Sequence, residues 1–277
     1  MPDFFLLFTY PFVIRALIVG IAVAISSSSL GSFLVLKKYS MIGDGLAHVS
    51  FMAIAVALVL NQSILWISIP IVSVASIIIM RLNENANIHG DAAIGLISSF
   101  SIAIGTIIIS MTKGFNIDID SYLFGSILLI QNADVILAIV VAVTIATLVI
   151  LFYPQLFMMT FDEEFARVNK IKTKYFNYLL AVLTAVTIII GIRAVGTLLI
   201  SSLIIFPTII ALQVTRGFKS TIITSVLISI ALIILGFIVS FAFDWPTGST
   251  IVVLNGITFL VIYLFKNLSM MTLRRAH

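Results

Sequence analysis

The sequence contains no cysteine, which excludes disulfide frameworks, thiolate metal sites and thiol nucleophiles. Charge is almost as scarce: charged residues make up 9% of the 277 residues, against about 25% in an ordinary soluble domain. No basic patch with interleaved aromatic residues is present, so we expect no nucleic-acid partner. The scarcity of charged residues excludes a water-soluble globule.

Nucleotide-binding and catalytic motifs are also missing. The closest approach to a P-loop, Gly217–Thr221 (GFKST), lacks the glycine before the lysine that lets the backbone wrap a phosphate. The sequence has no Gly-x-Ser-x-Gly, no His-Glu-x-x-His and no dinucleotide fingerprint. We therefore expect a chain that is not itself an enzyme, and an intramembrane enzyme is a remote alternative.

What the sequence has instead is long apolar runs, with 61% hydrophobic residues. A membrane-crossing helix needs about 20 consecutive apolar residues, and the runs are continuous and not alternating, which excludes a membrane β-barrel. We predict an all-α polytopic membrane protein, with residues 1–277 forming a single transmembrane domain. Nine spans are expected, an eight-span arrangement being the alternative: Phe12–Leu36, Met41–Leu60, Ile64–Met80, Ala92–Met111, Ala133–Tyr153, Phe176–Ile192, Val195–Val214, Thr221–Phe243 and Ser249–Phe265.

Lysine and arginine in the short loops predict the orientation of these spans, because positive loops stay in the cytoplasm. With nine crossings the C-terminus is cytoplasmic and the N-terminus is outside. Residues 1–4 have no cationic n-region and no cleavage site, so we expect them to be retained. Ser121–Ile130 is too short to cross and is expected to be re-entrant or interfacial. The residues that share the cytoplasmic side are Lys37, Lys38, Arg81, Lys170, Lys172, Lys174, Arg216, Lys219, Lys266, Arg274 and Arg275.

Asp44 and His48 form the candidate site. They are four residues apart and so share one face of a helix, and His48 is the only one of the three histidines inside an apolar run. Ionisable groups in a span are costly and usually functional. Imidazole suits zinc and carboxylate suits manganese, so transient binding of a divalent cation is the functional interpretation. The alternative is a polar pair that ties two helices together.

The segment 154–175 is the one long polar loop. Thr160 and Glu163 have the spacing of a capping box, and acidic residues followed by lysines suit the dipole of a short helix over Asp162–Lys174. Phe161, Phe165 and Val168 are spaced to share one face. The residues alone favour equally a membrane-surface helix and a docking helix for a soluble partner.

Several of these stretches resemble the ABC-3 family, the permease subunits of bacterial ABC importers for zinc and manganese. The most specific is Gly43–His48 (GDGLAH), which follows Gly31–Lys38 (GSFLVLKK). The likeness covers roughly residues 11 to 265. It continues in Asp91–Gly95 (DAAIG), Tyr122–Leu128 (YLFGSIL), Val195–Leu199 (VGTLL) with Pro207, and Asp244–Gly248 (DWPTG).

The resemblance implies a homodimer in the bacterial inner membrane that docks a separate cytoplasmic ATPase and receives metal from an external binding protein. It places Asp44 and His48 on the metal pathway, with zinc or manganese as cargo and no resident cofactor. Relatives commonly have glycine where this chain has Lys170. The alternative is a proton-coupled secondary transporter. The residues that the resemblance assigns to ATPase coupling are Phe161, Asp162, Glu163, Glu164, Phe165 and Ala166.

Overall fold

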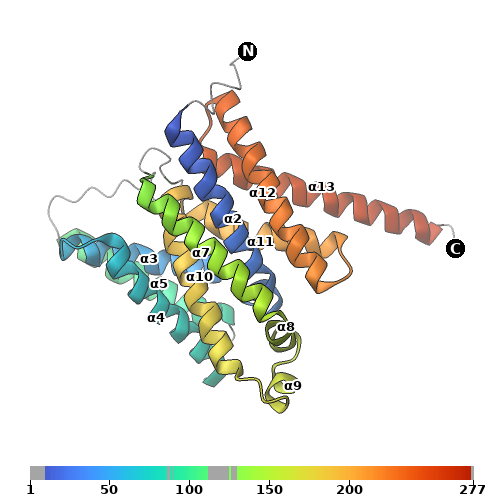
Figure 1. Ribbon diagram of the computed structural model, residues 1–277, viewed down its shortest axis with the longest axis horizontal. Coiled ribbons are helices and arrows are strands. Elements are labelled where there is room, and N and C mark those ends of the chain that lie inside the picture. The colour runs from blue at the N-terminus through green and yellow to red at the C-terminus, as the bar shows by residue number, and fades with distance from the viewer. Residues whose placement is uncertain (1–9, 86–87, 89, 112–124, 126–129, 276–277) are drawn as a thin grey trace.

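The computed structural model describes residues 10–85, 88, 90–111, 125 and 130–275, and within them all regular structure is helical (Figure 1). The N-terminal residues 1–4 and most of Ser121–Ile130 lie outside the described residues. The helices are α2 (Pro11–Leu36), α3 (Ile42–Val59), α4 (Ile64–Asn85), α5 (Gly90–Met111), α7 (Asn132–Leu151), α8 (Tyr153–Phe161), α9 (Glu163–Val168), α10 (Thr173–Val195), α11 (Thr197–Val214), α12 (Phe218–Phe243) and α13 (Thr247–Arg275).

Nine of the described helices are long and apolar enough to cross a membrane, which confirms the predicted count. Their bounds match the apolar runs closely; α3, for example, occupies Ile42–Val59 where Met41–Leu60 was expected. Pro70 and Pro207 lie inside α4 and α11. The length and apolarity of the runs in the sequence are therefore enough to locate the membrane-spanning helices.

The centre of the bundle is α2, which packs against α7, α10, α11 and α12. Its serine run Ser26–Ser29 is almost fully buried. Ser26 and Ser28 donate hydrogen bonds to the carbonyl four residues earlier, at 2.9 and 2.6 Å, so these hydroxyls are satisfied inside their own helix. Small side chains with satisfied hydroxyls let neighbouring helices approach closely.

Contacts at one end of the bundle join the segments that carry the lysines. Lys37 after α2 donates to Asn177 of α10, Asn83 of α4 donates to the hydroxyl of Tyr39, and Lys266 of α13 donates to the carbonyl of Gln213. We call this the lysine-rich end. The positive-inside rule predicts that this is the cytoplasmic end.

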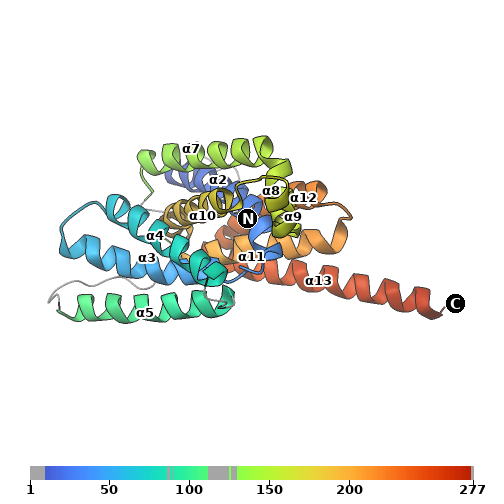
Figure 2. The same cartoon turned by 90° about the horizontal axis from the view of Figure 1, so that it is seen from below.

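The opposite end has its own inter-helix contacts. Arg193, at the end of α10, pairs with Asp134 in the first turn of α7 at 3.1 Å. Arg15 of α2 donates to the carbonyl of Ile130 at 3.2 Å. We call this the outer end. The helix α13 starts here, packs against α11 and α12, and then projects away from the bundle (Figures 1 and 2).

The prediction of one helix over Asp162–Lys174 is wrong. The structure has two short helices, α8 and α9, and Lys174 belongs to α10. Thr160 does not cap α9, because its hydroxyl donates to the carbonyl of Leu156. The cap is Asp162, whose carboxylate accepts the N–H of Phe165 at 2.8 Å.

The end of α9 explains its short length. Lys170 has φ of 61°, the left-handed conformation that glycine adopts most easily. Its N–H donates to the carbonyl of Arg167, and the N–H of Ile171 donates to the carbonyl of Ala166, which is the Schellman pattern. Lys170 thus adopts a left-handed backbone conformation that glycine would adopt without strain, and the helix ends at Val168.

Candidate metal pathway and coupling surface

Asp44 lies in the first turn of α3, three residues after the N-cap residue Met41. A carboxylate there is favoured by the unpaired N–H groups and the positive end of the helix dipole. His48 follows one turn later. The local sequence therefore fixes both side chains on one face of one helix.

Two glycines determine which face of α3 that is. A Cβ on Gly43 would lie 3.0 Å from the side chain of Ile204 in α11, and one on Gly45 would overlap the side chain of Ile94 in α5. The start of α3 is thus wedged between α11 and α5, and Figure 2 shows α3 running beside α5 and α4. The face that carries Asp44 and His48 is the one left open.

The two side chains point together without a direct hydrogen bond. Nε2 of His48 lies 3.7 Å from Oδ2 of Asp44, and the side chains are 37% and 51% exposed. Two ligands about 2.0–2.1 Å from one zinc ion at the tetrahedral angle are roughly 3.4 Å apart, so a small side-chain rotation suffices for shared coordination. No third histidine or acidic residue joins them among the described residues.

The pair lies near the lysine-rich end. Tyr39, in the connection between α2 and α3, is buried and holds Asn83 near the end of α4 at 2.6 Å. From there the chain reaches Asp44 within the first turn of α3. Neither a re-entrant turn nor a shifted span boundary separates the pair from Lys37 and Lys38.

Ser201 of α11 was not predicted as a site residue. Its Oγ lies 3.5 Å from the position of a Cβ on Gly43, next to Asp44. This oxygen is buried, and it has no hydrogen-bond partner within the described part of the chain. Only the tertiary packing of α3 on α11 reveals that proximity.

The segment predicted for ATPase coupling presents an apolar outer face. Phe161, Phe165 and Val168 are 59%, 56% and 80% exposed, and Glu164 is exposed beside them. Ala166 is fully buried on the opposite side. In Figure 1, α8 and α9 lie together at the end of the bundle where α7 ends and α10 begins.

Glu163 belongs to the inner side of α9. Its carboxylate lies 3.5 Å from Nζ of Lys37, accepts from Arg167 at 2.8 Å, and accepts from Asn177 at 3.4 Å. Burial by itself raises the pKa of Glu163. The hydrogen bond from Arg167 and the charges of Lys37 and Arg167 outweigh burial, so the pKa lies below its ordinary value of 4.5.

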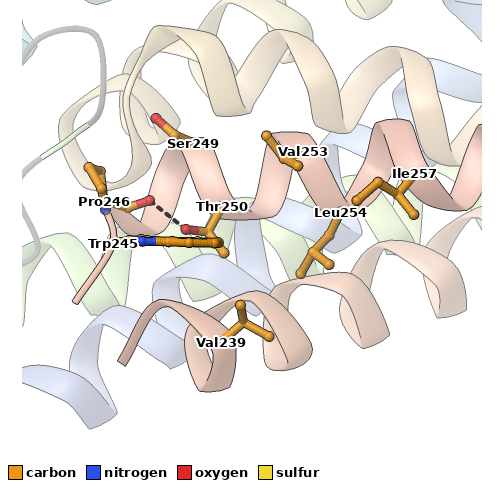
Figure 3. Close-up of a pocket in the computed structure, with 8 residues that line it drawn as sticks. All are labelled: Val239, Trp245, Pro246, Ser249, Thr250, Val253, Leu254 and Ile257. Atoms are coloured by element: carbon orange, nitrogen blue, oxygen red, sulfur yellow. Dashed lines mark hydrogen bonds between the residues drawn. The ribbon is translucent and has the colours of Figure 1, made fainter. Parts of the chain in front are cut away.

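The cavity in Figure 3 offers no competing metal site. It lies between α12 and α13 near the outer end, and its volume is about 470 Å³. Trp245, Val239 and Leu254 are among the residues that line it, and none of the lining side chains is ionisable. Thr250 uses its hydroxyl on the carbonyl of Pro246 at 2.9 Å. The cavity is suited to an apolar occupant.

A membrane-spanning bundle with an exposed ionisable pair on one helix and an apolar helix outside the spans defines the class of membrane permeases. Comparison with known proteins gives the family. The sequence profile described as the ABC 3 transport family matches residues 9–266. The chain therefore belongs to the ABC 3 transport family and is a multi-pass protein of the bacterial inner membrane.

Individual relatives agree with this assignment over nearly their whole length. The chain is 30% identical over 252 residues to the manganese import system permease protein ScaB of Streptococcus gordonii, covering 91% of this chain and 90% of that protein. It is 28% identical over 251 residues to the high-affinity zinc uptake system membrane protein ZnuB of Haemophilus influenzae, covering 91% and 96%. PsaBC from Streptococcus pneumoniae, solved in complex with Fab, superimposes with a TM-score of 0.81 at 31% identity, covering 93% and 92%.

Proposed function

We propose that this chain is the permease subunit of an ATP-driven importer for a divalent transition metal, zinc or manganese, and that Asp44 and His48 are transient ligands of the ion. The observation that carries the proposal is an imidazole and a carboxylate 3.7 Å apart on the open face of α3. The whole chain, 1–277, forms one permease domain, with the coupling segment at about 154–175. No resident cofactor is required, because the metal is the cargo.

The proposed partners follow from the surfaces left open. Two side chains underfill the coordination shell of a divalent ion, and their exposure lets a second copy of the chain, or water, complete it. This supports a homodimer with the pathway between the subunits. The exposed phenylalanines beside Glu164 suit a groove on a cytoplasmic ATPase. A metal-binding protein would deliver the ion at the outer end.

The mechanism that we propose is alternating access. Closure of the paired ATPases on nucleotide would displace α8 and α9, and the helices joined to them would shift so that the cavity between subunits changes sides. Asp44 and His48 would hold the ion during this change and release it afterwards. Energy would come from hydrolysis in the partner, since the chain itself has no P-loop.

The test is metal uptake in a strain that depends on this protein. Asp44→Ala and His48→Ala should each lower uptake about tenfold or more, because even groups outside a ligand shell typically change metal affinity about 10- to 100-fold. Asp91→Ala is the matched control, since Asp91 also lies in the first turn of a span, α5. Unchanged uptake in both site variants would refute the assignment. Uptake into liposomes without any ATPase, driven by a proton gradient, would establish a secondary transporter instead.

A further inference from the structure

The coupling segment is attached to the rest of the permease by two different kinds of contact. The helix α8 is held through aromatic rings, with Phe157 and Phe161 against Phe218 at centroid distances of 5.6 and 5.5 Å. The helix α9 is held through charge, with Glu163 against Lys37 at the end of α2 and Asn177 at the start of α10. The contacts of α8 with Phe218 are therefore apolar, whereas the contact of α9 with the end of α2 is ionic.

Lys37 is buried where it meets Glu163. Its side chain is only 8% exposed, and its ammonium also donates to Asn177 at 2.5 Å. An ionised group in such a place is tolerated only when it is paired. The pairing therefore holds α9 and the end of α2 together as one unit.

The connection from Lys37 to the pair of Asp44 and His48 is short and has backbone hydrogen bonds at both of its ends. The N–H of Lys38 donates to the carbonyl of Val35, and that of Tyr39 donates to the carbonyl of Leu34, which closes α2. The N–H of Ile42 then donates to the carbonyl of Tyr39, which opens α3. The end of α2 that carries Lys37 and the start of α3 that carries Asp44 are therefore joined by a short, hydrogen-bonded connection.

We propose that Glu163 is a positioning residue that links the coupling helix to the metal pair through Lys37. Glu163 lies in the segment expected to face the ATPase, but its carboxylate faces the permease, so its role differs from that of Glu164 and the exposed phenylalanines. The proposal rests on the proposed function. Movement of α9 imposed by the ATPase is transmitted by the Glu163–Lys37 contact to the α2–α3 connection, and thereby to Asp44 and His48.

The test uses the chain assembled with its ATPase and reconstituted in liposomes. Three quantities are measured: binding of the ATPase, the rate of ATP hydrolysis, and the number of metal ions imported per ATP hydrolysed. Glu163→Gln keeps the shape of the side chain and removes its charge, and Lys37→Met removes the partner. Asp134→Asn is the matched control, because it weakens a comparable inter-helix ion pair at the outer end, with Arg193.

We expect Glu163→Gln and Lys37→Met each to leave ATPase binding unchanged and to lower metal ions imported per ATP by roughly threefold or more, as contacting residues of one network are coupled. The double variant should be no worse than either single one. Asp134→Asn should keep the wild-type ratio. An unchanged ratio in Glu163→Gln, an equal fall in Asp134→Asn, or a loss fully explained by weaker ATPase binding would overturn the proposal. Absence of ATP-dependent import by the unaltered protein would instead refute the proposed function.

Discussion

Replacement of Gly31 by alanine should separate two helices at the centre of the bundle. Gly31 is buried in α2, and a Cβ there would lie 2.2 Å from the carbonyl oxygen of Ile204 in α11. Carbon and carbonyl oxygen approach in proteins to about 3.3–3.6 Å, so the helices must part by roughly 1 Å. Such a gap removes a quarter to a half of the dispersion energy of each contact across it.

Overpacking of this kind destabilises a protein by about 1–3 kcal/mol. In a chain of this size that lowers the melting temperature by about 2–12 °C. The measurement is the loss of the monodisperse peak in size-exclusion chromatography after heating in detergent. The control is Gly256→Ala in α13, where no atom lies within 4 Å of the added Cβ. The helix propensity of alanine should leave that variant unchanged or slightly more stable. Equal melting of Gly31→Ala and the unaltered protein would refute the packing argument.

Two further predictions concern α9. Lys170→Gly should stabilise its C-terminus by about 0.5–1 kcal/mol, because a left-handed residue with a side chain is strained by about 1–2 kcal/mol, partly offset by the flexibility of glycine in the unfolded chain. Amides of α9 should then exchange with deuterium more slowly, whereas Lys172→Gly, at φ of −75°, relieves no left-handed strain and should not slow exchange in α9. The lowered pKa of Glu163 means that the carboxylate stabilises the docked α9 above pH 4.5, and that this stabilisation is lost as the pH falls below that value through the lowered folded pKa. Proteolysis of segment 154–175 should therefore increase on acidification in the unaltered protein, and Glu163→Gln should abolish that dependence.

The spans were predictable because one property, continuous apolarity over about 20 residues, decides them without tertiary information. The pairing of Asp44 with His48 was predictable too, since helical spacing alone places them together. The coupling segment was not. Thr160 and Asp162 are both good cap residues, and only the structure shows that Thr160 donates backwards to Leu156 while Asp162 caps α9.

The role of Glu163 could not be predicted from the sequence, for a different reason. Its partner on another helix, Lys37, is far away in the chain, so neither helical spacing nor charge pattern connects the two residues. The left-handed backbone conformation of Lys170 could not be predicted from the sequence either, because lysine has no preference for that region. The comparison with the family's glycine identified the position, but only the backbone shows that Lys170 adopts the glycine-like conformation.

The proposed binding of the metal ion by only two side chains, Asp44 and His48, has a consequence for the time that the ion stays bound. An ion that arrives near the diffusion limit of about 10⁹ M⁻¹ s⁻¹ and binds with micromolar affinity dissociates in about 1 ms. With nanomolar affinity, typical of a fully ligated site, it stays about 1 s, which is longer than the ~0.1 s of a typical enzymatic turnover. If Asp44 and His48 bind the ion as proposed, a chain with no cysteine, and with no third histidine or acidic residue near the pair among its described residues, would hold the ion for less time than one catalytic cycle of the proposed ATPase.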